Sequence, residues 1–271
     1  MRVMCALGAI LTAMAVLAAC DRAPVTGRTR LAPVSDRELT QQAAQLYSEE
    51  LRTNPLSRDP AQVALVRRVG ERIARAAENP PDGKWQAPRF DWEFNVIDKP
   101  DVINAYCLPG GKIAVYTGIF KVAPDEASLA AILGHEISHA LLRHHGERVA
   151  QQNAVGAGAA MAGAIVGAVI GGRDNSASGS ALGMGLAVAG NTLILSFGRT
   201  QEYEADRVGM ILAARAGYDP RAAVGVWQRM GEQARSRGRA PEFLSTHPSE
   251  ASRIREIEAH LPEALSYYQP R

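Results

Sequence analysis

The chain has 271 residues, of which 30 are basic and 28 are acidic, so its formal net charge is only +2. This balance, without a basic stripe, argues against a nucleic-acid-binding protein. The length suffices for one domain with a proper core. Of three cysteines, Cys5 is expected to leave with a signal peptide and Cys20 to carry lipid, as argued below, so Cys107 alone remains and can form neither an internal disulfide nor a cysteine-based zinc site. We interpret Cys107 as a small packing residue rather than a nucleophile.

The N-terminus has the pattern of a secretory signal. One early positive charge, Arg2, precedes an uncharged apolar stretch that ends in small residues. The tetrapeptide Leu-Ala-Ala-Cys that ends at Cys20 resembles a bacterial lipobox, which implies cleavage before Cys20 and its lipidation. The alternative is an N-terminal transmembrane helix, but the apolar run is short. We therefore predict a lipoprotein signal peptide at 1–19, a lipidated cysteine and tether at 20–34, and one domain at 35–271.

Helical and strand patterns then follow one another along the chain. We predict an amphipathic helix in SDRELTQQAAQLYSEELRTN, capped by Ser35 or Asp36, and a second helix over about 60–77. The segment RFDWEFNVID alternates apolar and polar residues as a strand does, and two more short strand patterns flank a Pro-Gly-Gly turn that includes Gly110 and Gly111. The sequence therefore predicts an α+β fold, mostly helical, with a small antiparallel sheet beside a long helix.

The stretch 154–198 is rich in alanine and glycine and consists of two apolar arms around the polar break RDNSASGS. Two interpretations stay open. The first is a helical hairpin whose small residues allow close backbone approach, and the second is a membrane hairpin. The scarcity of large apolar side chains favours the first.

The motif HEISH, residues 135–139, lies in an apolar helical pattern that opens at 124–126. A helix places His135 and His139 one above the other on nearly the same face, with Glu136 beside them. Two imidazoles in this arrangement can bind one divalent metal ion and leave a carboxylate next to it.

A third ligand is expected from the segment RTQEYEADRVG. Glu202 and Asp206 are four residues apart and share a helix face, whereas Glu204 points elsewhere. Glu202 can therefore bind the metal, and Asp206 can hold a ligand imidazole by its other nitrogen. Glu204 is the weaker ligand candidate.

Four stretches in this order resemble the HExxH zinc metallopeptidase family that includes CaaX prenyl endopeptidases, HtpX, and Oma-type and BepA-type proteases. They are INAYCLPGGKIAVYTGI, LAAILGHEISHALLRHHGER, RTQEYEADRVG and STHPSEASRI. Integral-membrane relatives have hydrophobic spans between HExxH and the third ligand. Here that interval holds the glycine-rich stretch, so we expect the lipid anchor to replace those spans. The chain is most similar to compact single-domain periplasmic lipoprotein members.

The resemblance implies roles for individual residues. One Zn²⁺ per chain would be bound by His135, His139 and Glu202, with Glu136 as general base and Asp206 as supporting acid.

The resemblance also implies a substrate-binding strand. The strand region that borders the cleft in relatives, and that could pair with an extended substrate, is matched here by Asn104, Gly110 and Gly111. His247 corresponds to a loop histidine near the metal, acting either in catalysis or in a latent state. Arg253 either pairs with the acids around the metal or is an ordinary exposed arginine. His144 and His145 lie five and six residues beyond His139, off the ligand face of a continuous helix, so the helical period leads us to expect surface or capping residues.

We predict a membrane-anchored zinc endopeptidase in which Glu136 assists the attack of water that zinc activates. Its expected substrates are unfolded or misassembled envelope proteins, and its expected location is the periplasmic side of a bacterial membrane, inner or outer, through lipid on Cys20. Nucleic acid is not an expected partner. Two alternatives stay open: a chaperone-like lipoprotein that binds such chains with little or no cleavage, and a zinc hydrolase of non-peptide amides.

Overall fold

The computed structural model describes residues 20–31, 35–80, 88–151, 188–189, 192–193, 197–238, 240–247 and 251–270. The helices are α2 (Asp36–Thr53), α3 (Pro60–Glu78), the 3-10 helix η2 (Thr117–Lys121), α4 (Glu126–Leu141), α6 (Arg199–Arg215), α7 (Ala222–Arg237), α8 (Glu242–Thr246) and α9 (Ala251–Leu265). The strands are β1 (Cys20–Arg22), β2 (Thr29–Leu31), β3 (Glu93–Ile97), β4 (Ala105–Leu108), β5 (Lys112–Tyr116), β6 (Val188–Ala189) and β7 (Thr192–Leu193).

The first two helices of the domain confirm the periodic patterns. In α3, Asp59 caps the N-terminus by accepting hydrogen bonds from the backbone of Ala61 and Gln62, and Pro60 occupies the first turn, where it removes no hydrogen bond. Val66 and Ile73 of its apolar stripe are fully buried, and Val63 is partly buried. Ser35 is the N-cap of α2 but makes no capping hydrogen bond with its side chain.

The predicted small sheet is present, with one difference in its topology. The strand order is β3-β5-β4, and β5 is antiparallel to β4 but parallel to β3. The sheet is therefore mixed rather than antiparallel throughout. The reason is that β4 and β5 form a tight hairpin, whose turn residues Gly110 and Gly111 both have φ of +87°, and β5 inserts between the other two strands.

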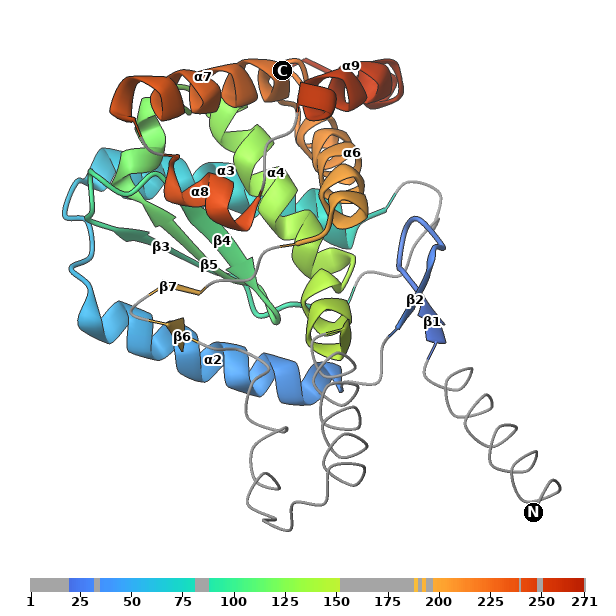
Figure 1. Ribbon diagram of the computed structural model, residues 1–271, viewed down its shortest axis with the longest axis horizontal. Helices are drawn as coiled ribbons and strands as arrows, with labels where there is room; N and C mark the ends of the chain where they lie inside the picture. The colour runs from blue at the N-terminus through green and yellow to red at the C-terminus, as the bar shows by residue number, and fades with distance from the viewer. Residues whose placement is uncertain are drawn as a thin grey trace, which may run out of the picture.

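Helix α4 lies at the centre of the molecule, with the sheet on one side and α6 on the other (Figure 1). It packs against α3, α6, α7 and β4. The contact with α6 is unusually close because two glycines meet there. A Cβ added to Gly134 would lie 2.6 Å from the carbonyl oxygen of Gly209. This approach brings the two helices that carry the candidate ligands together.

The N-terminal segment predicted as a tether contains a two-stranded hairpin. β1 and β2 pair in antiparallel fashion, with Cys20 opposite Leu31. The hairpin lies beside the lower part of α4 in Figure 1. It also contacts α6, which is far from it in sequence. Its side chains contact the helices of the domain: Thr26 and Arg28 bind Glu204, and Arg28 binds Glu147.

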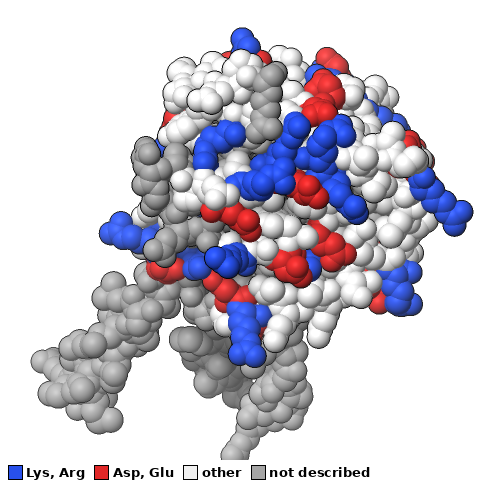
Figure 2. All heavy atoms as spheres, turned by 180° about the vertical axis from the view of Figure 1, so that it is seen from behind, with Lys and Arg blue, Asp and Glu red and all other residues white. Residues whose placement is uncertain are grey.

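Two predictions concern residues outside those described: the signal peptide at 1–19 and most of the 154–198 stretch. Within the described part of the chain, no helix combines the length and apolar character needed to cross a membrane. Figure 2 shows basic and acidic side chains interspersed on one face, in keeping with the balanced composition.

Candidate metal centre

The HEISH motif lies in the second half of α4, whose N-terminus is capped by the carboxylate of Asp125 on the backbone of Ser128 at 2.8 Å. His135, Glu136 and His139 are all buried. A buried carboxylate beside two buried imidazoles is costly unless the groups bind something or one another. The helix thus delivers three chemically active side chains to one interior site.

Helix α6 contributes the acidic side chains. Glu202 lies in its first turn and Asp206 one turn later, and both are buried. The Gly134–Gly209 contact holds this helix against α4, so both carboxylates reach the imidazoles. His247 enters from the end of α8 and is also buried.

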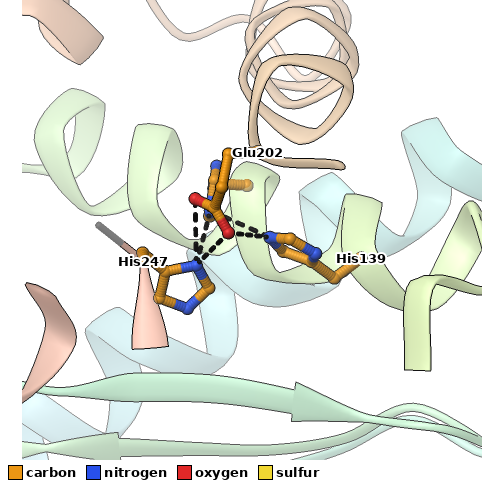
Figure 3. Close-up of side chains that lie close together, drawn as sticks. His139, Glu202 and His247 are labelled. Atoms are coloured by element: carbon orange, nitrogen blue, oxygen red, sulfur yellow. Dashed lines mark hydrogen bonds and ion pairs between the residues drawn. The ribbon is translucent and has the colours of Figure 1, made fainter. Parts of the chain in front are cut away.

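Four side chains converge closely enough to hold one metal ion. Their ligand atoms, from His135, His139, Glu202 and His247, lie within 4.8 Å of one another. His135 Nε2 lies 3.0 Å from His139 Nε2 and 3.1 Å from His247 Nδ1, and that Nδ1 lies 3.0 Å from Glu202 Oε1. Figure 3 shows the Glu202 carboxylate directed toward His139 and His247. Three ring nitrogens and a carboxylate facing one point form the donor set that zinc prefers, so these residues fit the ion.

A second set of charges surrounds this group. Asp206 Oδ1 lies 2.9 Å from His135 Nδ1, the nitrogen that faces away from the four-residue group. Arg253 donates to Asp206 at 2.7 Å and lies 2.6 Å from Glu202, with its guanidinium 3.7 Å above the ring of Trp227. Arg253 is therefore fully buried among the acids, not exposed. This contact stabilises two carboxylates that would otherwise repel each other.

These contacts set the protonation of the site. Burial alone would lower the pKa of His135, but the hydrogen bond and charge of Asp206, together with Glu202, raise it to about 9. Burial works against ionisation of Glu202 as well, yet the charges of His247 and Arg253 and hydrogen bonds from the histidines lower its pKa. The chain therefore holds Glu202 ionised, as a metal ligand must be.

Glu136 differs from the other acids. Burial raises its pKa above the usual range for a glutamate. Its Oε1 has no hydrogen-bond partner and lies 3.4 Å from His247 Nε2. Glu136 lines a small cavity together with Asn104 and Tyr106 of the β4 region. Glu136 thus has a carboxylate oxygen that accepts no hydrogen bond and lies beside the four-residue group. It can therefore exchange a proton with a molecule bound there.

The structure separates the three residues predicted to border a substrate. Asn104 lines the cavity that contains Glu136 and His247. Gly111 and Gly110 form the β4–β5 turn instead, and Gly110 lines a different cavity of about 400 Å³. Of these three residues, Asn104 alone lines the cavity beside Glu136.

The prediction for His144 and His145 is wrong, because both side chains are buried. The helical count from His139 fails because α4 ends at Leu141 and Arg143 has a φ of +58°, so the helical phase is reset before residue 144. His144 Nδ1 then lies 3.0 Å from His139 Nδ1. No pattern in the sequence signals a positive φ at an arginine.

Glu204, the weaker ligand candidate, lies outside the four-residue group. Its carboxylate contacts His144, Arg28 and Thr26.

Phe197 was not predicted, and its ring stacks on His139 with centroids 4.0 Å apart. It lies near the end of the 154–198 stretch, where an isolated phenylalanine carries no sequence signal of its role.

Known proteins similar to this chain are metalloendopeptidases and a related protease. Mitochondrial metalloendopeptidase OMA1 of Schizosaccharomyces pombe is 35% identical over 244 residues, covering 89% of this chain and 66% of the relative. Metalloendopeptidase OMA1 of Bos taurus is 31% identical over 249 residues, covering 89% and 46%. The beta-barrel assembly-enhancing protease of Yersinia pestis is 29% identical over 243 residues, covering 88% and 47%. The chain thus spans between 46% and 66% of the length of these relatives.

The model of Peptidase family M48 matches residues 60–261, which include α3, the sheet and every member of the four-residue group. The matched region exceeds half of the chain, and the most similar of these relatives share about a third of its residues. The chain belongs to Peptidase family M48.

Proposed function

We propose that the chain is a zinc-dependent endopeptidase that cleaves unfolded or misassembled cell-envelope proteins. The observation that carries this proposal is the buried group of His135, His139 and Glu202 with the carboxylate of Glu136 beside it. Family membership and the metalloendopeptidase names of the relatives support the same activity.

In the proposed reaction, bound zinc would polarise the scissile carbonyl and lower the pKa of the attacking water. Glu136 accepts the proton of that water on Oε1, which accepts no hydrogen bond in the structure described, and then donates it to the leaving amine. Its raised pKa suits both roles, because the carboxyl group must hold the proton transiently. Asp206 and Arg253 keep His135 and Glu202 in place.

His247 gives the group a fourth ligand, and a site closed by four protein ligands has no position for substrate. We infer that the arrangement described is a latent state, from which His247 must withdraw before cleavage. Its contact with Glu136, at 3.4 Å, would also be released by that movement. The alternative is that His247 remains close and hydrogen-bonds the reacting carbonyl. Replacing His247 with alanine should raise turnover in the first case and lower it in the second.

The β4 strand supports recognition of extended chain. It is at one edge of its sheet in the described residues, and its start lines the cavity with Glu136. An edge strand pairs with backbone groups and therefore selects extended polypeptide rather than one sequence. We propose that substrate adds to this edge, beginning near Asn104.

The proposed location is the periplasmic side of a bacterial membrane, with lipid on Cys20 as the anchor. The lipobox-like tetrapeptide supports this, and so does the similarity to a bacterial protease named for beta-barrel assembly. The OMA1 relatives are named as mitochondrial proteins, so similarity alone does not favour one compartment. Labelling of the chain with a fatty-acid analogue, lost on Cys20→Ser, would test the anchor.

The activity is tested by incubating the zinc-loaded protein with an unfolded envelope protein and with the same protein folded. We expect cleavage of the unfolded form only, and none by the Glu136→Gln variant. Binding without cleavage by the wild type would favour the chaperone-like alternative. Hydrolysis of small amides but not of polypeptide would favour the non-peptide hydrolase.

A further inference from the structure

The second ring nitrogen of His139 has a buried partner. While Nε2 faces the four-residue group, Nδ1 lies 3.0 Å from Nδ1 of His144. His144 has no exposed surface, and its Nε2 lies 3.2 Å from Glu204 Oε2. A chain of ring nitrogens therefore runs from a candidate metal ligand to a carboxylate.

The direction of these hydrogen bonds follows from ligation. A metal on His139 Nε2 requires the lone pair there, so the proton of the neutral ring is on Nδ1 and is donated to His144. His144 accepts at Nδ1, carries its own proton on Nε2, and donates it to Glu204, since a carboxylate only accepts. One carboxylate thus fixes the tautomers of both rings.

Glu204 is itself held from the N-terminal hairpin. Thr26 donates to its Oε1 at 2.6 Å, and Arg28 Nε donates to its Oε2 at 3.0 Å. The two terminal nitrogens of Arg28 bind Glu147 at 2.8 and 2.7 Å, which fixes the guanidinium. The β1–β2 hairpin thus reaches the metal centre through two side chains.

We propose that His144 and Glu204 are positioning residues for His139, and that Thr26 and Arg28 make the N-terminal hairpin a supporting part of the metal centre. This inference rests on the proposed function, because it takes His139 as a ligand through Nε2. The two ligand histidines are then supported unequally: His135 by Asp206 directly, and His139 by a carboxylate acting through a second imidazole. Support of this kind sets metal affinity as well as geometry.

The test measures zinc affinity of the full chain by chelator competition, together with the visible absorption spectrum of the cobalt-substituted protein. We expect zinc binding about 10- to 100-fold weaker, with an altered cobalt spectrum, in His144→Leu and Glu204→Ala. His144→Asn should recover most of the affinity, because its amide oxygen can accept the proton of His139 Nδ1. The control, Asp91→Asn, removes an exposed ion pair with Lys112 that involves neither the hairpin nor Glu204, and should bind zinc like the wild type.

Each other outcome decides against the proposal. Wild-type zinc affinity and cobalt spectrum in folded His144→Leu and Glu204→Ala would overturn it. Equal losses of zinc affinity in His144→Leu and His144→Asn would also overturn it, because they would indicate a merely structural role for His144.

Should these variants fail to fold, Thr26→Val removes only one hydroxyl and should still weaken zinc binding by about 2- to 10-fold. Unchanged affinity there would also overturn the proposal. Zinc-dependent cleavage by the wild type that is lost in Glu136→Gln would keep the proposed function intact in every one of these cases.

Discussion

Arg253 is a fully buried cation between the carboxylates of Glu202 and Asp206. Burial opposes its charge, but the two acids raise its pKa above the usual arginine value, so it stays protonated. Removing one partner of a buried charge cluster leaves the others uncompensated, which costs far more than the net strength of the contact.

We expect Arg253→Met to destabilise the metal-free protein by about 3–5 kcal/mol. Added zinc should recover part of this lost stability, because the bound zinc ion would supply a positive charge beside the Glu202 carboxylate. Urea unfolding with and without zinc measures both effects. Arg207→Met is the matched control, since its partner Glu263 is partly exposed, and it should cost less than about 1 kcal/mol. Equal losses of stability in the two variants would show that the buried position of Arg253 does not strengthen its contribution.

The single cysteine of the domain should be chemically silent in the folded state. Cys107 is buried, and burial raises the pKa of its thiol well above the usual value. The thiolate is the reactive form, so alkylation should be very slow at pH 8 and become fast only when urea unfolds the protein. Rapid alkylation of the folded protein would show that this part of the core opens readily.

At the scale of elements, the metal centre depends on how closely α4 and α6 approach. Gly134 and Gly209 form the contact, and a Cβ on Gly209 would lie 2.7 Å from the backbone nitrogen of His135. Backbone atoms cannot rotate away, so a larger residue must separate the helices. Such a separation would move Glu202 away from the histidines.

Gly209→Ala should therefore destabilise the protein by about 1–3 kcal/mol through overpacking, and it should also weaken zinc binding. Gly231→Ala on α7 is the control. Its new Cβ would meet only the end of Arg235 at 3.5 Å, so it should stabilise the helix by up to about 1 kcal/mol. Thermal unfolding and zinc titration of both variants measure the difference. A tolerated alanine at 209 with normal zinc affinity would contradict the close packing.

At the scale of the whole molecule, the apolar core is built without the metal ligands. It joins side chains of α3, α4, α6 and α7 to one face of the sheet, including Ile73, Leu133, Leu212 and Met230. This core should maintain the fold when zinc is removed. The metal then adds stability only through its binding to the native state.

Removal of zinc should leave the far-ultraviolet circular dichroism unchanged while lowering the free energy of unfolding. With free zinc at a thousandfold excess over its Kd, the expected gain is about 4 kcal/mol. Glu202→Ala should show a much smaller gain under the same conditions. Loss of secondary structure on chelation would show that the metal, rather than the core, maintains the fold.

The sequence predicted the helices, the small sheet and the family because each depends on short-range periodicity or on motifs with fixed spacing. Periodic apolar residues from Val63 to Ala77 marked α3, and residues 135–139 marked the metal-binding helix. The parallel pairing of β3 with β5 was not predictable, since it depends on where the β4–β5 hairpin inserts.

The outer part of the candidate site was predicted least well. His144 was misplaced because the positive φ of Arg143 resets the helical phase, and sequence periodicity assumes that the phase continues. The role of Thr26 and Arg28 depends on a contact across more than a hundred residues, which no local pattern encodes. Long-range polar contacts of this kind become visible only in the folded chain.

In the proposed mechanism, one zinc ion and the Glu136 carboxylate act together to cleave a peptide bond. The most direct measurement titrates metal-free protein with zinc and follows cleavage of an unfolded protein and bound zinc in the same samples. We predict that wild-type cleavage rises to a plateau at one zinc per chain, whereas Glu136→Gln binds the same amount of zinc and cleaves nothing. Cleavage by Glu136→Gln at the wild-type rate, or cleavage without bound zinc, would contradict this mechanism.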